Sequence, residues 1–267
     1  MKRSDRLVAM TEFFINNPHR WEPLTVFTQK YAASKSSVSE DLNIIHENFT
    51  REGIGAIERV TGAHGGVKYI PYFDKTQTGA FIDTICERLE DPDRILPGGY
   101  LYMSDLLGDP HTVNELAKAF VTAFHNREID AVITVETKGI PLAYAVANYL
   151  NVPVVIIRRN MRVTEGSSVS INYVSARSQR IQTMVLAKRH LQEGMNVCII
   201  DDFMKAGGTI AGMKNLLGEF KANVAGVGVL AEAEGAEEPM IDDYISLVKV
   251  SNISGETGKI SVSSGIM

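Results

Sequence analysis

Two adjacent acidic residues followed by a glycine-rich loop form the stretch of this sequence best suited to chemistry. Four apolar residues at 197–200 predict a short buried strand, and Asp201 and Asp202 follow where that strand is expected to end. A small-residue loop then leads into a predicted amphipathic helix. The apolar face of that helix is formed by Ile210, Met213, Leu216, Leu217 and Phe220.

The loop is suited to binding a phosphate. Backbone N–H groups of residues 206–209 can point at phosphate oxygens, the helix dipole adds partial positive charge, and glycine has no Cβ to block the approach. A pair of carboxylates would repel a phosphate, so we expect Asp201 and Asp202 to accept hydrogen bonds from a ribose diol. Together these features describe a ribose 5-phosphate. The alternative is an ordinary loop that leads into a helix and binds no ligand.

This stretch resembles the 5-phosphoribosyl-1-pyrophosphate (PRPP) motif of type I phosphoribosyltransferases, in which four apolar residues, two acids and a small Gly-Gly-Thr loop follow in order. The sequence contains no Walker A pattern, and the glycines at 62–66 lack the spacing of a dinucleotide fingerprint. The resemblance implies a run of PRPP-binding residues: Asp201, Asp202, Phe203, Met204, Lys205, Ala206, Gly207, Gly208 and Thr209.

Alternating strands and helices in residues 129–267 predict an α/β domain with a parallel sheet. Strands are expected at 131–135 and 154–157, and Pro141 is expected to open the helix between them. Ligands bind at the carboxyl ends of such strands, so the loop at 137–139 should lie beside the loop at 201–209. We therefore predict further contacts to PRPP from Thr137, Lys138 and Gly139, which resemble the pyrophosphate loop of the transferases, and from Arg158 and Tyr100.

A mobile hairpin with a cationic surface is predicted between residues 158 and 180. Its arginines are Arg158, Arg159, Arg162, Arg177 and Arg180, against one acid, Glu165. Two interpretations stay open: a solvated edge hairpin, or the flexible loop that covers the pyrophosphate in the transferases.

Residues 1–73 predict three helices followed by a β-hairpin, which is the outline of a winged helix-turn-helix domain. The third helix, which we expect to start at the capping-box pair Ser37 and Glu40, would contact DNA. A small helical dimerisation domain is the alternative. If DNA binds, we expect backbone contacts from Lys2, Arg3, Arg6, Lys35, Arg59 and Lys68, and base-edge contacts from Ser36, Ser37, Ser39 and Asn43.

The segment 74–128 connects the two predicted domains, with the boundary placed near residue 74. Helices are expected at 74–90 and at about 112–126, and a turn at 97–100. Tyr100, Tyr102 and Phe203 are candidates for stacking on a base.

Composition narrows the class of protein. The chain has 267 residues and a net charge of −5, but residues 1–73 carry nine Lys or Arg against eight Asp or Glu, so this segment is the less acidic one. No apolar run approaches the ~20 residues of a membrane span. The two cysteines and the scattered histidines lack disulfide or metal-ligand spacing, so a cytoplasmic protein with no metal held by protein ligands alone is expected.

Over its full length the chain resembles the PurR family of purine operon regulators of Gram-positive bacteria. The residues that carry this resemblance include the stretches 36–41, 96–100, 137–140, 163–167, 170–174 and 201–209. The resemblance implies a homodimer that binds double-stranded DNA at purine-gene promoters and senses PRPP, alone or with Mg²⁺. It also implies a transferase fold that has lost catalysis, with purine nucleotides or guanosine tetraphosphate as competitors for the pocket.

Two positions depart from the catalytic transferases. Lys205 stands where those enzymes usually have a small residue or an aspartate, and Ala206 where they usually have threonine. No carboxylate base is therefore present there, which favours ligand binding over base chemistry. Three hypotheses remain: a PRPP-sensing transcription factor, an active xanthine-type phosphoribosyltransferase with an accessory domain, and a structural dimer protein.

Overall fold

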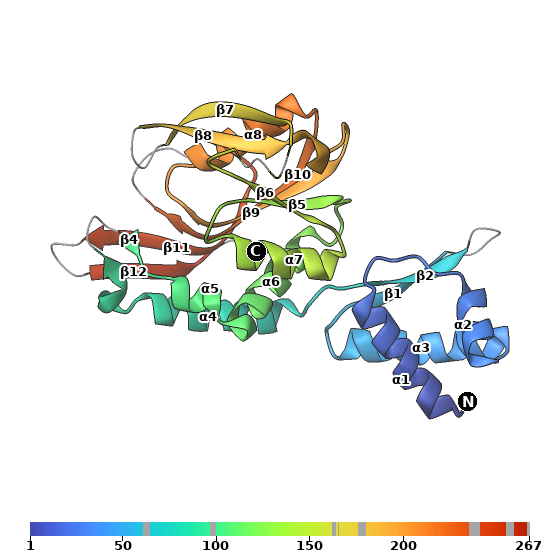
Figure 1. Cartoon of the computed structure of the whole chain (residues 1–267). Coiled ribbons are helices and arrows are strands. Elements are labelled where there is room, and N and C mark those ends of the chain that lie inside the picture. The colour runs from blue at the N-terminus through green and yellow to red at the C-terminus, as the bar shows by residue number, and fades with distance from the viewer. Residues whose placement is uncertain are drawn as a thin grey trace.

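The structure is a computed structural model of the whole chain (Figure 1). It describes residues 1–60, 65–96, 100–161, 164, 166–175, 180–234, 241–254 and 259–265. Figure 1 shows a small N-terminal unit, coloured blue, beside a larger unit built on a central sheet, and the segment after β2 connects them.

The N-terminal unit is a three-helix bundle followed by a two-stranded antiparallel sheet, as predicted for a winged helix. Its core is built around Phe14, Phe27 and Phe49, all of which are fully buried. The ring of Phe49 lies 4.8 Å from that of Tyr69 and so joins helix and sheet. The elements are α1 (Arg3–Asn16), α2 (Leu24–Tyr31), α3 (Lys35–Arg51), β1 (Ala56–Val60) and β2 (Gly66–Ile70).

The predicted start of the third helix is wrong by three residues. The N-cap is Ser34, whose hydroxyl accepts a hydrogen bond from the backbone N–H of Ser37, so Ser37 already lies inside the helix. Four serines at positions 34, 36, 37 and 39 offered competing caps. With Ser34 as the cap, Val38 lies inside the helix on the same buried face as Leu42.

The larger unit is a six-stranded sheet in the order β12-β11-β10-β9-β5-β6, and all neighbouring pairs are parallel except β11 with β12. This confirms the predicted parallel sheet and the strands at 131–135 and 154–157. The strands are β5 (Ala131–Val135), β6 (Val154–Ile157), β9 (Asn196–Met204), β10 (Asn223–Ala233), β11 (Ile245–Ser254) and β12 (Lys259–Ser264).

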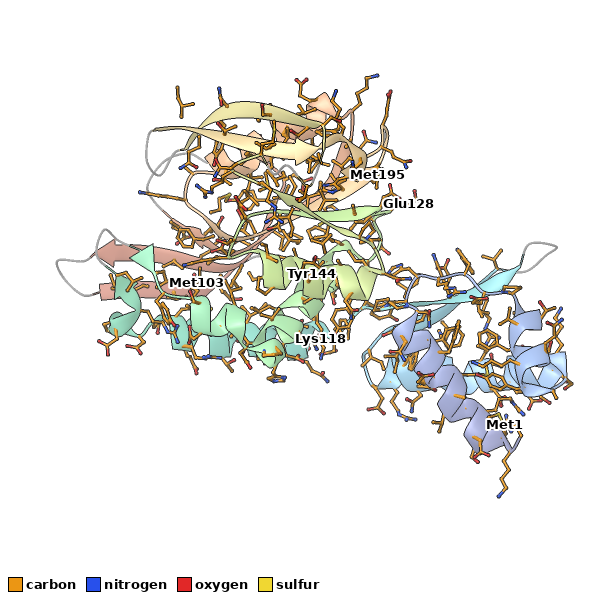
Figure 2. All side chains as sticks on the ribbon, viewed as in Figure 1. Met1, Met103, Lys118, Glu128, Tyr144 and Met195 are labelled. Atoms are coloured by element: carbon orange, nitrogen blue, oxygen red, sulfur yellow. The ribbon has the colours of Figure 1, made fainter. Side chains whose placement is uncertain are left out.

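Helices cover one face of the sheet, and a helix with a hairpin covers the other (Figures 1 and 2). On the first face lie α4 (Lys75–Leu89), α5 (Ser104–Gly108), α6 (Pro110–Phe124) and α7 (Ile140–Leu150). On the second face lie α8 (Gly208–Glu219) and the antiparallel hairpin of β7 (Ser168–Ser175) and β8 (Arg180–Ala187). The short strands β3 (Ile95–Leu96) and β4 (Tyr100–Leu101) pair with each other.

Two of the predicted helices begin at an aspartate that caps their first turn. Asp74, at the predicted domain boundary, caps α4 by accepting from the N–H of Gln77. Asp109 caps α6 in the same way, so that helix starts at Pro110, two residues before the predicted position. Residues 97–99 of the predicted turn at 97–100 and residues 61–64, which include Gly62, lie outside the described residues.

Two glycines of β10 let α6 pack directly on the sheet. A Cβ at Gly228 would come within 2.6 Å of the ring of Phe120, and one at Gly226 within 2.8 Å of Phe124. Both rings are buried, and so is Ile200, whose Cδ1 lies 3.0 Å from the same added Cβ at Gly228. The aromatic residues of α6 therefore pack directly against the backbone of β10.

We expect Gly228→Ala to lower the free energy of unfolding of the larger unit by about 1–3 kcal/mol, because the new methyl group overpacks the α6 contact. The matched control is Gly108→Ala in α5, where an added Cβ meets no described atom within 4 Å. Urea titration of both variants checks this. Equal stability of the two variants would contradict the proposed packing.

Candidate functional sites

The carboxyl edge of the sheet brings the two predicted phosphate loops together. Because β5 and β9 are parallel neighbours, the chain leaves both strands on the same side. A Cβ added at Gly139, after β5, would lie 2.6 Å from the Thr134 hydroxyl and 3.0 Å from a carboxylate oxygen of Asp201 on β9. The prediction that the loop at 137–139 lies beside the loop at 201–209 is confirmed.

The acidic pair belongs to the strand itself, which corrects the predicted strand end. β9 continues through Met204, and Asp201 and Phe203 pair in register with Val229 and Ala231 of β10. The predicted strand ended at residue 200 because carboxylates are uncommon within buried strands. Here the backbone hydrogen bonds between β9 and β10 extend beyond the two acids, so the strand continues after them.

The two carboxylates have different environments. Asp201 is 4% exposed, and one of its oxygens accepts the backbone N–H of Asp202 at 2.9 Å. Burial raises the pKa of Asp201 well above its ordinary value, and the neighbouring charge of Asp202 raises it further. Asp202 is half-buried. The fold therefore favours the protonated form of Asp201, and Asp202 is the acid nearer to solvent.

The loop after β9 leaves helix α8 without a side-chain cap. Its N-cap, Gly207, has φ = +76°, a left-handed conformation that favours glycine, and among the described residues no side chain caps this helix end. Ala206, Gly207 and Gly208 are buried and Lys205 is exposed. The backbone N–H groups at the start of α8 are thus oriented for an anion at the rim.

Helix α7 offers a second uncapped N-terminus at the same rim. Its N-cap is Gly139, again with no side-chain cap among the described residues, and Pro141 lies in the first turn as predicted. Thr137 and Lys138 are exposed in the loop before it, and the Glu136–Thr137 peptide bond is cis. Two helix dipoles and the Lys138 ammonium therefore favour negative charge along one edge of the sheet.

Glu136 connects the ends of β5 and β6. Its carboxylate lies 3.3 Å from the Arg158 guanidinium and accepts the backbone N–H of Arg159 at 2.8 Å. Arg158, predicted as a PRPP ligand, thus lies near the rim in an ion pair with Glu136. Sequence reasoning passed over Glu136, since its arginine partners lie more than twenty residues away.

The predicted hairpin is present as β7–β8, shifted toward the C-terminus of the predicted stretch, and it packs on α8. A Cβ at Gly212 of α8 would lie 3.0 Å from the Tyr173 ring, and the Tyr173 hydroxyl donates to Gln182. Arg162, Glu165 and Arg177 lie outside the described residues, as do the side chains of Arg180 and Tyr100. Tyr102 is 42% exposed and Phe203 is half-buried against the α6 face.

The predicted DNA contacts mostly lie on the surface of the N-terminal unit. The exposed ones are Lys2, Arg3, Lys35, Ser36, Asn43 and Arg59, and Ser37 and Ser39 are half-buried. The guanidinium of Arg59 lies against Ser39, with its Nη atoms 3.5 Å from the hydroxyl and 3.4 Å from the carbonyl oxygen. Lys68 lies 4.8 Å from the Trp21 ring and 3.1 Å from Glu58.

Arg6 differs from the other predicted contacts. It is 8% exposed, and its Nε donates to the carboxylate of Asp41, which is fully buried. The burial of Arg6 therefore disfavours its predicted contact with the DNA backbone, because its guanidinium is already paired inside the domain. No local pattern could have revealed this, because the two residues lie 35 positions apart.

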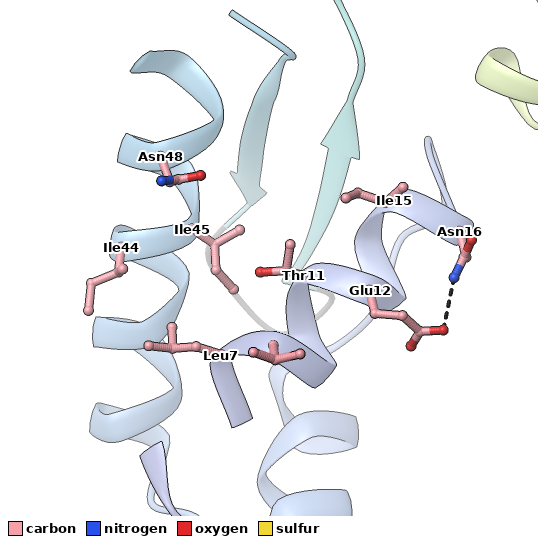
Figure 3. Close-up of a pocket in the computed structure, with 9 residues that line it drawn as sticks. Leu7, Thr11, Glu12, Ile15, Asn16, Ile44, Ile45 and Asn48 are labelled. Carbon is pink, nitrogen blue, oxygen red and sulfur yellow. Dashed lines mark hydrogen bonds between the residues drawn. The ribbon is translucent and has the colours of Figure 1, made fainter. Parts of the chain in front are cut away.

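An apolar groove of about 530 Å³ runs between α1 and α3 (Figure 3). It is lined by Leu7, Val8, Thr11, Glu12, Ile15, Asn16, Ile44, Ile45 and Asn48. Val8 and Ile15 are 71% and 51% exposed. The groove holds no basic side chain, so it is unsuited to contacting phosphates.

Neither a metal centre nor a membrane span is found in the described ranges. No group of three or more His, Cys, Asp or Glu residues there could hold a metal ion. None of the described helices is long and apolar enough to cross a membrane.

The fold and sites define a class of protein in which a DNA-binding domain precedes a phosphoribosyltransferase-type domain. Residues 2–71 match the model of the N-terminal domain of bacterial purine repressors, and residues 106–259 match that of the phosphoribosyltransferase domain. The chain belongs to the family of PurR purine biosynthesis transcriptional regulators.

Similar proteins match either nearly the whole chain or mainly its larger unit. The purine biosynthesis transcriptional repressor PurR of Bacillus subtilis is 55% identical over 99% of this chain and 93% of its own length. The purine biosynthesis transcriptional activator PurR of Lactococcus lactis is 43% identical over 99% and 98%. A xanthine phosphoribosyltransferase of Lactobacillus johnsonii is 31% identical over 63% of this chain and 91% of its own.

Among solved structures, adenine phosphoribosyltransferase of Rhodothermus marinus superimposes with a TM-score of 0.55. The match covers 63% of this chain and 97% of that one, at 20% identity. This likeness establishes the fold of the larger unit.

We expect the stability of the protein to fall as the pH rises above about 4, because Asp201 ionises there in the unfolded chain, while its raised pKa delays ionisation in the fold. Asp201→Asn removes this loss, which is at most about 1.4 kcal/mol per pH unit. Thermal melting of wild type and variant between pH 5 and 8 measures the difference. Parallel pH profiles would contradict a raised pKa of Asp201.

Proposed function

We propose that this chain is a DNA-binding regulator of purine biosynthesis genes whose phosphoribosyltransferase-type domain binds PRPP as an effector. The observation that carries the proposal is the pairing, at one sheet edge, of two uncapped helix N-termini with a half-buried carboxylate. The N-terminus of α8 suits a 5-phosphate, that of α7 suits a pyrophosphate, and Asp202 suits a ribose hydroxyl.

Mg²⁺ fits this proposal as a companion of the pyrophosphate. Among the described residues no cluster of acidic or histidine ligands would hold such an ion by itself. A cation bound to PRPP would add positive charge between the phosphates and Asp202. Purine nucleotides and guanosine tetraphosphate present comparable phosphates and compete for the same rim in this proposal.

Two features support the loss of catalysis. Lys205 is exposed at the loop where a carboxylate base would act, and Ala206 offers no hydroxyl. Burial raises the pKa of Asp201, the acid beside Gly139, which disfavours its charged form as a general base. The site can hold a phosphoribosyl group, but its loop carries a lysine where a carboxylate base would act.

The DNA-binding proposal rests on α3 as the helix that enters the major groove. Ser36 and Asn43 are exposed on that helix, Ser39 is half-buried, and Lys35, Arg3 and Arg59 surround them with positive charge. We further propose a homodimer formed by the larger units, because two α3 helices related by symmetry would contact a two-part site.

A catalytic xanthine-type transferase with an accessory domain is the second candidate. The phosphate loop, which has the transferase pattern, favours it, as does the transferase-type fold. Positioning and charge stabilisation account for much of such a reaction, so a bound nucleobase could still react without a carboxylate at position 205.

One pair of assays distinguishes the candidates. The full chain is mixed with PRPP and xanthine, guanine or hypoxanthine, and nucleotide formation is followed by absorbance. The same preparation is titrated onto duplex DNA from a purine-gene promoter, with sedimentation giving the number of chains per duplex. We expect no turnover and two chains bound per site. Sustained nucleotide synthesis without DNA binding would establish the transferase instead.

A further inference from the structure

A buried carboxylate connects the first and third helices of the N-terminal unit. Asp41 of α3 is fully buried and accepts hydrogen bonds from Arg6 Nε and, at 3.0 Å, from Arg3 Nε. Arg3 also donates from Nη2 to the exposed carboxylate of Glu40 at 3.3 Å. The four side chains form an ion cluster with two positive and two negative charges.

The two arginines have different exposure. The side chain of Arg6 is 10% exposed, whereas that of Arg3 is 51% exposed although both are bound to the same carboxylate. A buried carboxylate needs a charged partner, and Arg6 supplies one inside the domain. Because Arg6 already compensates the charge of Asp41, the second contact, from Arg3, is not needed for that purpose. Its effect is on the exposed surface of the domain.

Arg3 lies at the border of the predicted DNA-contacting face. At 100° per residue, Ser36, Ser39 and Asn43 fall on one side of α3, and Glu40 lies at the edge of that side. Arg3 reaches Glu40 from α1. In helix-turn-helix domains the first part of the third helix contacts base edges while neighbouring elements contact phosphates.

We propose that Asp41 is a positioning residue for DNA binding: it holds Arg3 by Nε so that Nη2 can exchange Glu40 for a DNA phosphate. The guanidinium is planar and rigid, so fixing Nε fixes the direction of both terminal nitrogens. Arg6 compensates the charge of Asp41 and does not contact DNA. This inference rests on the proposed DNA-binding role of α3.

The consequence is measured in the full chain by the salt dependence of binding to a fluorescent promoter duplex. Each phosphate contact contributes about 0.9 to the slope of log affinity against log salt. Arg3→Gln should lower the slope by about that amount per bound unit, which is roughly a threefold smaller loss of affinity between 50 and 200 mM salt. Arg51→Gln is the matched control, since Arg51 is exposed at the far end of α3 and pairs with Glu52.

The test of Asp41 replaces the buried pair by apolar residues, Asp41→Leu with Arg6→Met, which preserves packing without burying a lone charge. We expect this variant to lose the same slope as Arg3→Gln, and the triple variant to lose no more. A normal slope in the double variant, or additive losses in the triple, would show that Asp41 is only structural.

An exposed variant keeps the test decisive if the buried replacement fails to fold. Glu40→Gln removes the competing partner of Arg3 and should raise DNA affinity at least twofold at 50 mM salt. Unchanged or weaker binding would overturn the exchange of Glu40 for phosphate. Wild type that binds no promoter DNA would instead overturn the proposed function itself.

Discussion

The parallel pairing of β5 with β9 is the constraint on which the proposed effector site depends. It places the starts of α7 and α8, neither of which has a side-chain cap among the described residues, at one edge of the sheet. The close approach of Gly139 to Thr134 and Asp201 fixes the separation of the two loops. A side chain at residue 139 would move one helix start away from the other.

The same pairing separates the effector site from the DNA-binding unit. A polar crevice of about 540 Å³ between the two units is lined by His19 and Lys68 on one side and by Asp130 and Asn151 on the other. Asp130 exchanges backbone and side-chain hydrogen bonds with Asn196, the first residue of β9. The proposed effector site and this crevice thus lie toward opposite ends of β9, whose nine residues measure about 30 Å.

Burial also explains the lowered pKa of His19 in that crevice, which falls to about 4 with a smaller contribution from Lys68. The imidazole is therefore neutral at physiological pH. An effector changes DNA affinity only if it binds two arrangements of the units with different affinity, so the crevice is the place where such arrangements would differ.

Much of the fold followed from local patterns. The apolar strands and the Gly-Gly-Thr loop predicted the parallel sheet and α8. The alternation of apolar and polar residues in 53–70 predicted the β1–β2 hairpin. Register did not follow: β9 runs through its acids because β10 pairs with them. The roles of Arg6, Asp41 and Glu136 depend on partners more than twenty positions away, which no periodicity encodes.

In the proposed function, PRPP bound at the rim of the sheet controls DNA binding. The measurement is the affinity for promoter DNA titrated against PRPP, for wild type and for Asp201→Ala with Asp202→Ala. Losing one hydrogen bond to a charged group and one to a predominantly protonated acid should weaken PRPP binding by roughly 2–4.5 kcal/mol. The double variant should therefore bind DNA with the same affinity at every PRPP concentration, while the affinity of wild type shifts. A variant whose DNA affinity shifts as wild type does would place the sensor site elsewhere.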